Sequence, residues 1–167
     1  MELKFSGRRI KVLAGDAESP DGSTSYREIV IHPGAVVLLP ISGEKILLIK
    51  QYRHAVKEWI IELPAGTLEE GETPEEAAER ELLEETGYRA KKLRRLISFY
   101  SSPGISNEIL HVFLAEDLEE DSPRREKGEI IENFWATMNE VLSLIEKNKI
   151  KDAKTIASIL YYYQFLS

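Results

Sequence analysis

The stretch "AGTLEEGETPEEAAERELLEETGY", residues 65–88, places nine glutamates in twenty-four residues. Thr73 is a suitable N-cap for a helix, and Pro74 fits the first helical position. Gly87 supplies the left-handed residue at which helices commonly end. The stretch therefore predicts a loop followed by a helix that runs from Pro74 to about Thr86.

Three of the glutamates, Glu81, Glu84 and Glu85, fall near the end of this helix. Their spacing of three and four residues puts them on one face, where like charges repel by roughly 0.2–0.5 kcal/mol per pair. The negative end of the helix dipole disfavours them further. Arg80 can pair with Glu84, but we expect Glu81 to have no cationic partner on its own helix. A solvated charged helix explains the other glutamates well. The cluster instead favours a bound hard cation, Mg²⁺ or Mn²⁺.

Composition narrows the class of protein. A chain of 167 residues with 43% hydrophobic residues predicts one domain with a sizeable core. The net charge of −7 disfavours binding to nucleic acid or to anionic membranes, so a phosphate-bearing substrate needs local positive charge or a metal ion. The absence of cysteine excludes disulfides, thiolate catalysis and cysteine-based zinc sites. The three histidines are far apart in the sequence, which argues against a zinc site.

The sequence gives no sign of a membrane protein. The first residues, "MELKFSGRRIKV", lack the apolar core of a signal peptide. No apolar run approaches the roughly 18 residues that a spanning helix needs. We therefore expect a cytoplasmic enzyme or binding domain.

Strand and helix patterns alternate along the chain. The turn "PDGS" separates two strand-like segments and predicts an N-terminal hairpin. Further apolar segments predict strands, and two segments near the end predict helices. This order indicates a mixed sheet packed between helices, within a single domain that spans residues 1–167. The predicted strands are 8–19, 24–32, 35–41, 45–53, 58–64, 93–101, 109–118 and 130–137, and the final helices are 138–149 and 153–166.

Residues 66–88 resemble the Nudix box. All seven fixed positions of that motif match over twenty-three residues, in the expected loop–helix–loop context. Only the last aliphatic position departs, because it is Tyr88, and this affects packing rather than chemistry. The matching positions are Gly66, Glu72, Arg80, Glu81, Glu84, Glu85 and Gly87.

The resemblance implies an α/β fold (α+β), the Nudix-type α/β/α sandwich with a mixed sheet and an N-terminal antiparallel hairpin. It also implies a magnesium site, with Mn²⁺ as an alternative metal. Glu81 and Glu85 would bind the metal directly, Glu84 directly or through water, and the Ala65 carbonyl would be a further ligand.

Other box residues take supporting roles by the same resemblance. Arg80 would orient a glutamate, and Arg80 and Glu84 count with the catalytic residues. Glu72 would brace the loop against the helix, and Gly66 would let the backbone turn close to the metal. Nudix enzymes hydrolyse a nucleoside diphosphate linked to another group, with metal ions that bridge the pyrophosphate and activate water.

Features outside the box resemble the ADP-ribose pyrophosphatase branch. Pro103 lies sixteen residues after Gly87, inside "SSPGISNEILHVFLAEDL", which is similar to a motif of that branch. The segments "LLIKQYRHAVKEWIIELPAG" and "REIVIHPGAVVLLP" are similar to others. The resemblance implies substrate contacts, and the residues concerned are Arg27, Glu28, Arg53, Pro103 and Glu108.

The same branch implies a homodimer with shared active sites. Its N-terminal strands, residues 1–32 here, cross a two-fold axis and complete the site of the partner subunit. Arg27 and Glu28 lie on these strands.

The catalytic base is expected outside the box, because metal-bound glutamates are poor proton acceptors. In the branch, the base comes from a late loop that precedes a strand. Glu129 is therefore the expected base or metal–water ligand, and Gly128 gives the loop a flexible joint. Glu126 and Glu132 remain alternatives.

The expected function is Mg²⁺-dependent hydrolysis of ADP-ribose to AMP and ribose 5-phosphate. The same chemistry on another nucleoside diphosphate sugar, or on a dinucleotide such as NADH, stays open. A third hypothesis is a sensor that binds ADP-ribose without cleaving it, and the intact glutamates count against it.

Overall fold

The computed structural model describes residues 1–122 and 130–166. The strands are β1 (Glu2–Ser6), β2 (Lys11–Glu18), β3 (Thr24–Ile31), β4 (Ala35–Ser42), β5 (Lys45–Arg53), β6 (Glu58–Glu62), β7 (Ala65–Thr67), β8 (Tyr88–Tyr100), β9 (Ile109–Glu120) and β10 (Ile131–Thr137). The helices are α1 (Pro74–Glu81), a π-helical turn η1 (Leu82–Thr86), α2 (Met138–Glu146) and α3 (Ala153–Phe165).

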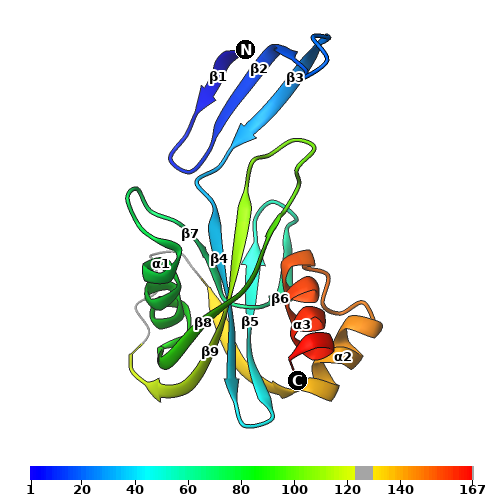
Figure 1. Ribbon diagram of the computed structural model, residues 1–167. Helices are drawn as coiled ribbons and strands as arrows, with labels where there is room; N and C mark the ends of the chain where they lie inside the picture. Colours follow the sequence, from blue (N-terminus) through cyan, green and yellow to red (C-terminus); the bar gives the residue numbers. More distant parts are fainter. Residues whose placement is uncertain (123–129, 167) are drawn as a thin grey trace.

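The main sheet has seven strands in the order β10-β5-β4-β9-β8, with β6 paired to β5 and β7 paired to β4. It is mixed, because β4 and β9 run parallel while the other pairs are antiparallel. Helix α1 lies on one side and helices α2 and α3 lie on the other (Figure 1). The predicted mixed sheet between helices is therefore confirmed.

Strand β4 is the centre of the core, because its alternating side chains enter two apolar clusters. Val37 and Leu39 belong to the cluster that packs against α2 and α3, whereas Val36 and Leu38 belong to the cluster under α1. All four are completely buried. The apolar run of β4 reflects this burial on both faces.

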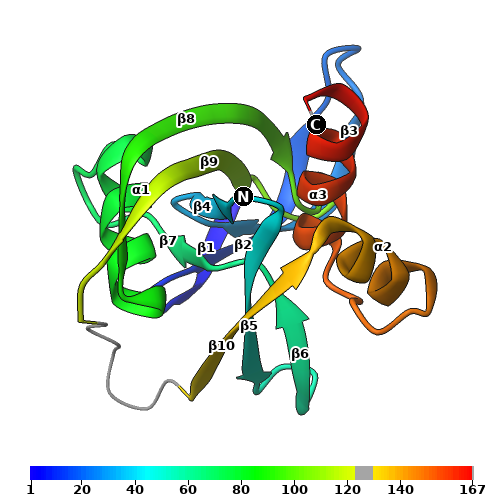
Figure 2. The same cartoon turned by 90° about the horizontal axis from the view of Figure 1, so that it is seen from below.

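Strand β8 contributes to both clusters, since a bulge between Arg95 and Ile97 shifts its register against β9. Leu93, before the bulge, packs with the α1 cluster, and Phe99, after it, packs with the α2/α3 cluster. Figure 2 shows β8 and β9 curving across the molecule from the α1 side toward the α3 side. Bulges increase the local twist in this way.

The N-terminal strands form a separate antiparallel sheet, β1-β2-β3, which projects from the main body (Figure 1). Of the hydrophobic residues in these fully described strands, only Ala14 is buried. The N-terminal sheet is joined to the main body at the end of β3. There Val30 donates its N–H to the Ile105 carbonyl at 2.8 Å, and His32 N–H donates to Asn107 Oδ1 at 2.7 Å.

The structure corrects several boundaries. Strands β1 and β7 were not predicted, because both are short and depend on pairing partners elsewhere in the chain. Strand β8 begins at Tyr88, directly after the helix stop, rather than at Leu93. The predicted helix 74–86 is α-helical only as far as Glu81. None of the helices in the described residues combines the length and apolar composition required to span a bilayer.

Candidate active site

The box helix starts as predicted and ends in an unusual way. Thr73 Oγ1 accepts the Glu76 N–H at 3.3 Å, and the Glu76 carboxylate accepts the Thr73 N–H at 2.9 Å, which completes the capping box. After Glu81 the chain widens into the π-helical turn η1 and stops at Gly87, whose φ is 78°. Such turns are rare and often occur at functional sites.

Arg80 binds more acidic groups than sequence spacing predicts. Its Nε and Nη2 donate to the two carboxylate oxygens of Glu72 at 2.7 and 2.8 Å. Its Nη1 donates to Glu81 at 2.6 Å and to Glu84 at 3.1 Å. The hydrogen bonds with Glu72, above all, raise the pKa of Arg80 against the opposing effect of burial. The expectation that Glu81 lacks a cation on its own helix is wrong, since the adjacent Arg80 reaches it.

Arg80 also joins the loop to the helix, because Nη2 donates to the Thr67 carbonyl at 3.2 Å. Glu72 additionally accepts the Glu69 N–H at 2.9 Å, so both ends of its carboxylate are held. Through these bonds Glu72 connects the loop to Arg80 on the helix, which is the bracing role expected from the sequence. The sequence predicted that a metal ion would compensate the negative charge of the clustered glutamates. The Arg80 guanidinium supplies part of this positive charge.

Glu85 is only 3% exposed, and its Oε2 accepts the Ala65 N–H at 2.9 Å. Glu81 is packed against Gly66 so closely that a Cβ at that position would lie 1.8 Å from its carboxylate carbon. Gly66 is thus required by the approach of Glu81. Asn133 Nδ2 donates to the Thr86 carbonyl at 2.9 Å, which satisfies one of the carbonyls at the end of η1.

Arg53, Glu62 and Lys154 form an ion cluster next to the glutamates. Arg53 Nε and Nη2 donate to Glu62 at 2.7 and 2.8 Å, and Lys154 Nζ donates to the same carboxylate. Glu62 is completely buried. Burial opposes the charge of Arg53, but the hydrogen bond to Glu62 and the nearby Glu85 more than offset it and raise the pKa of Arg53.

A small cavity of about 140 Å³ lies between these groups. Arg53 turns two of its donors toward Glu62, and Nη1 makes no hydrogen bond with a residue in the described part of the chain. The cavity thus combines acidic and basic walls. Its lining includes Arg9, Arg53, Ala65, Gly66, Thr67, Glu81, Glu84, Glu85 and Lys154.

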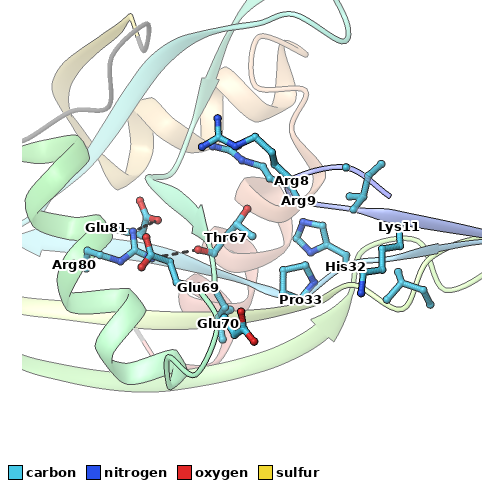
Figure 3. A pocket seen from close by; sticks show the side chains of 14 residues that line it. Arg8, Arg9, Lys11, His32, Pro33, Thr67, Glu69, Glu70, Arg80 and Glu81 are labelled. Atoms are coloured by element: carbon cyan, nitrogen blue, oxygen red, sulfur yellow. Dashed lines mark hydrogen bonds and ion pairs between the residues drawn. The ribbon is translucent and has the colours of Figure 1, made fainter. Parts of the chain in front are cut away.

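A second cavity of about 550 Å³ adjoins the first, and Arg9, Thr67 and Glu81 line both. Figure 3 shows its two sides, with the turn between β1 and β2 on one and the box loop on the other. The charged or polar residues that line it are Arg8, Arg9, Lys11, His32, Thr67, Glu69, Glu70, Arg80 and Glu81.

Known proteins with similar sequences and folds support the resemblance found in residues 66–88. The sequence profile of the NUDIX domain matches residues 31–159. The chain belongs to the Nudix family. It is 48% identical to an ADP-ribose pyrophosphatase of Bacillus subtilis, over 96% of this chain and 88% of the relative. It is 43% identical to a methanol dehydrogenase activator of Bacillus methanolicus, with the same two coverages of 96% and 88%.

A solved structure described as an ADP compounds hydrolase has the same fold. The superposition has a TM-score of 0.86 at 24% identity and covers 99% of this chain and 90% of that chain. The similarity confirms the predicted Nudix-type fold.

The residue types of the Nudix box suit a hard divalent cation, since they are carboxylates and a backbone carbonyl. Within residues 1–122 and 130–166, no three Asp, Glu or His side chains converge closely enough to hold a metal ion. Glu81 and Glu84 point to the same Arg80 nitrogen, and Glu85 is bonded to Ala65. A metal ion bound here would compete with these hydrogen bonds for the carboxylate oxygens.

The other predicted site residues are dispersed. Arg27 and Glu28 are exposed on β3, and Pro103 is exposed in the loop before β9. Glu108 accepts a hydrogen bond from the Ser101 hydroxyl and lies 3.4 Å from His32 Nδ1. None of these four residues lines either of the two cavities beside the box.

Of the three candidates for the catalytic base, only Glu132 lies within the described residues. Glu126 and Glu129 lie outside the described residues. Glu132 is exposed on β10, and the side chain of its neighbour Asn133 reaches Thr86 at the box. Because successive side chains of a strand alternate, Glu132 points to the opposite face of the sheet, away from the glutamates.

Sequence reasoning missed the basic residues around the site. Arg8, Arg9 and Lys11 stand within four residues of each other in a chain of net charge −7, and that run was a usable signal. Glu62 and Lys154 gave no such signal, because they are 92 residues apart and meet only in the fold.

Glu72 provides a pH-dependent test of the loop brace. Replacing it by glutamine should lower the free energy of unfolding at pH 7 by about 1–2 kcal/mol, since a charge-assisted bidentate bond to Arg80 is lost. The hydrogen bond from Arg80 lowers the pKa of Glu72 below its ordinary 4.5. The stabilisation is therefore present above pH 4.5 and disappears as the pH falls below that value. Unfolding curves of both proteins between pH 7 and pH 3 measure this, and a constant difference down to pH 3 would contradict it.

Proposed function

We propose that the protein hydrolyses the diphosphate of ADP-ribose to AMP and ribose 5-phosphate, with Mg²⁺ or alternatively Mn²⁺ as cofactor. The observation that carries the proposal is the small cavity, where the Nudix-box glutamates face Arg53 and Lys154. Such walls suit a metal-bound diphosphate. The name of the Bacillus subtilis relative supports ADP-ribose as the substrate.

In the proposed mechanism, Arg53 and Lys154 bind the anionic diphosphate and compensate its charge. Arg53 is pre-positioned by Glu62, and its Nη1 is the donor that remains for a phosphate oxygen. Lys154 stands beside it on the same carboxylate. Because these cations are fixed before substrate arrives, little ordering is needed when the phosphates bind.

Glu81, Glu84 and Glu85, together with the Ala65 carbonyl, would hold the metal ion. When bound, Mg²⁺ supplies charge neutralisation at the phosphates and lowers the pKa of a coordinated water. Arg80 positions Glu81 and Glu84, so we assign it a positioning role. Without it the two carboxylates would repel each other at the end of the helix.

We further propose Glu129 as the base that takes the proton of the attacking water. Glu129→Gln should lower turnover by about 10²–10⁴-fold with little change in KM, because a base acts in the transition state. Steady-state rates of the Glu126→Gln, Glu129→Gln and Glu132→Gln variants at saturating Mg²⁺ measure this. Loss of turnover in Glu126→Gln alone would reassign the base, and unchanged rates in all three would refute a base in this segment.

A substrate panel tests the proposed function. The protein is incubated with Mg²⁺ and ADP-ribose, GDP-mannose or NADH, and the products are separated and identified. We expect kcat/KM to be highest for ADP-ribose, with AMP and ribose 5-phosphate formed in equal amounts. A higher kcat/KM for another compound would make that compound the substrate in place of ADP-ribose. Binding of ADP-ribose without formation of products would indicate a sensor.

The proposed assembly is a homodimer in which the N-terminal sheet completes the site of the partner subunit. The sheet exposes large apolar side chains, Leu3 at 56%, Phe5 at 54% and Tyr26 at 61%, which favours a covering partner. Arg27 and Glu28 lie outside the cavities of their own subunit, so substrate contact by them calls for a second copy.

Sedimentation velocity at micromolar concentration tests the dimer. We expect a species of twice the chain mass of 19.0 kDa. Replacing Phe5 by lysine should shift the population toward monomer, because a charge would enter the apolar contact. A fully active monomer of the unmodified protein would exclude shared active sites.

A further inference from the structure

The larger cavity has a basic wall that the hydrolysis of a diphosphate does not require. Arg8 and Arg9 come from the turn between β1 and β2, and Lys11 is the first residue of β2. All three line the cavity opposite Glu69 and Glu70 (Figure 3). The chain has a second basic run at residues 91–95, but three of its four cations pair with acidic residues, namely Lys91 with Glu119, Lys92 with Asp117 and Arg95 with Glu75. Repulsion among Arg8, Arg9 and Lys11 is a cost that an anionic ligand would remove.

Two of these cations are available for a ligand. Arg8 and Lys11 are exposed and form no side-chain hydrogen bond or ion pair with another residue that the structure describes. Most other cations near the site are already engaged. Arg80 is bonded to Glu72, and both Arg53 and Lys154 are bonded to Glu62.

The position of the wall indicates which part of a substrate it meets. The two cavities share Arg9, Thr67 and Glu81, so a ligand bound at the glutamates can extend directly into the larger space. A volume of about 550 Å³ lies in the range of small-molecule sites, whereas about 140 Å³ suits a diphosphate. The nucleoside is the larger half of ADP-ribose and therefore fits the larger cavity.

We propose that Arg8 and Lys11 form a subsite for a phosphate monoester on the ribose of the nucleoside, at its 2′ or 3′ hydroxyl. This inference rests on the proposed function, since it extends the same site. The substrate class is then a nucleoside diphosphate with an additional phosphate on the nucleoside ribose. The guanidinium of Arg8 can donate two parallel hydrogen bonds to a phosphate, and Lys11 adds a point charge. Glu69 and Glu70, on the other side, are acceptors for remaining hydroxyls.

Calorimetric titration without metal tests the subsite separately from catalysis. The probes are AMP, adenosine 2′,5′-bisphosphate and adenosine 3′,5′-bisphosphate. We expect one of the bisphosphates to bind about tenfold more tightly than AMP, as charge-assisted bonds at an exposed site allow. The preference should weaken at high salt.

Three proteins are compared: the parent, the double variant Arg8→Ala/Lys11→Ala, and the control Lys4→Ala. Lys4 lies on the same sheet, is exposed and pairs with Glu2, but does not line the cavity. The double variant should lose the bisphosphate preference, and the control should keep it. Equal affinities for AMP and both bisphosphates in the parent would overturn the subsite. Equal loss in the control would also overturn it, because the attraction would then be non-specific.

Different results would refute the hydrolysis of ADP-ribose and the phosphate subsite. If ADP-ribose is not hydrolysed in the presence of Mg²⁺, the proposed function fails whatever the titrations give. If ADP-ribose is hydrolysed but the bisphosphates bind no better than AMP, only the subsite fails.

Discussion

Replacing Glu81 or Glu85 by glutamine should lower the turnover of ADP-ribose at least about a hundredfold while the fold persists. Loss even of a group that only supports a metal ligand typically costs 10–100-fold, and loss of a ligand should cost more. The amide keeps the size of the side chain, and at position 85 its carbonyl oxygen can still accept the Ala65 N–H. Only the negative charge is removed.

The matched control is Glu79→Gln. Glu79 is exposed on α1, so the same change of charge is made on the same helix outside the cavities. Rates at saturating Mg²⁺ and melting temperatures are measured for all three variants. Parental turnover in Glu81→Gln and Glu85→Gln would show that the box glutamates are not the metal site.

Replacing Glu62 by glutamine should lower the free energy of unfolding by about 1.5–3 kcal/mol, because the buried carboxylate loses its charge-assisted hydrogen bonds to two cations. Glu62 is completely buried and binds both Arg53 and Lys154. The variant loses this shared anion, while Lys154 keeps Asp152 at 3.0 Å and Arg53 stays partly exposed to water. A loss of this size is a substantial part of the roughly 5–15 kcal/mol that typically stabilises a domain. Denaturant unfolding measures it.

Glu58→Gln is the control for this prediction. Glu58 is on the same strand, β6, but its ion pair with Lys151 at 3.0 Å is about half exposed on both sides. Such surface pairs contribute about 0–1 kcal/mol. Equal losses in the two variants would contradict the account of the ion cluster. The Glu62 variant should also raise the KM for ADP-ribose, since Arg53 loses the group that orients it.

Local features of the site could be predicted from the sequence because they depend on neighbouring residues. The capping box at Thr73 and the left-handed stop at Gly87 both follow from backbone groups within one helical turn. The apolar runs of β4 and β5 identified the central strands, because burial on both faces leaves a direct mark on composition.

Features that depend on distant contacts could not be predicted. The π-helical turn after Glu81 accompanies long-range bonds, such as that from Asn133 to Thr86, that no local pattern encodes. Helical spacing also failed for Arg80, because its long side chain reaches Glu81 beside it and Glu72 eight residues earlier. The predicted repulsion among the glutamates is consequently smaller than helical geometry alone implies.

Direct binding of Mn²⁺, followed by electron paramagnetic resonance, tests the central claim that the Nudix-box carboxylates hold a catalytic metal ion. Mn²⁺ prefers the same oxygen ligands as Mg²⁺ and gives a signal when free. The titration compares the parent with the double variant Glu81→Gln/Glu85→Gln and with Glu79→Gln. The account predicts saturable binding in the parent and in Glu79→Gln, and a dissociation constant at least about tenfold higher in the double variant. Identical binding curves for the parent and the double variant would contradict it.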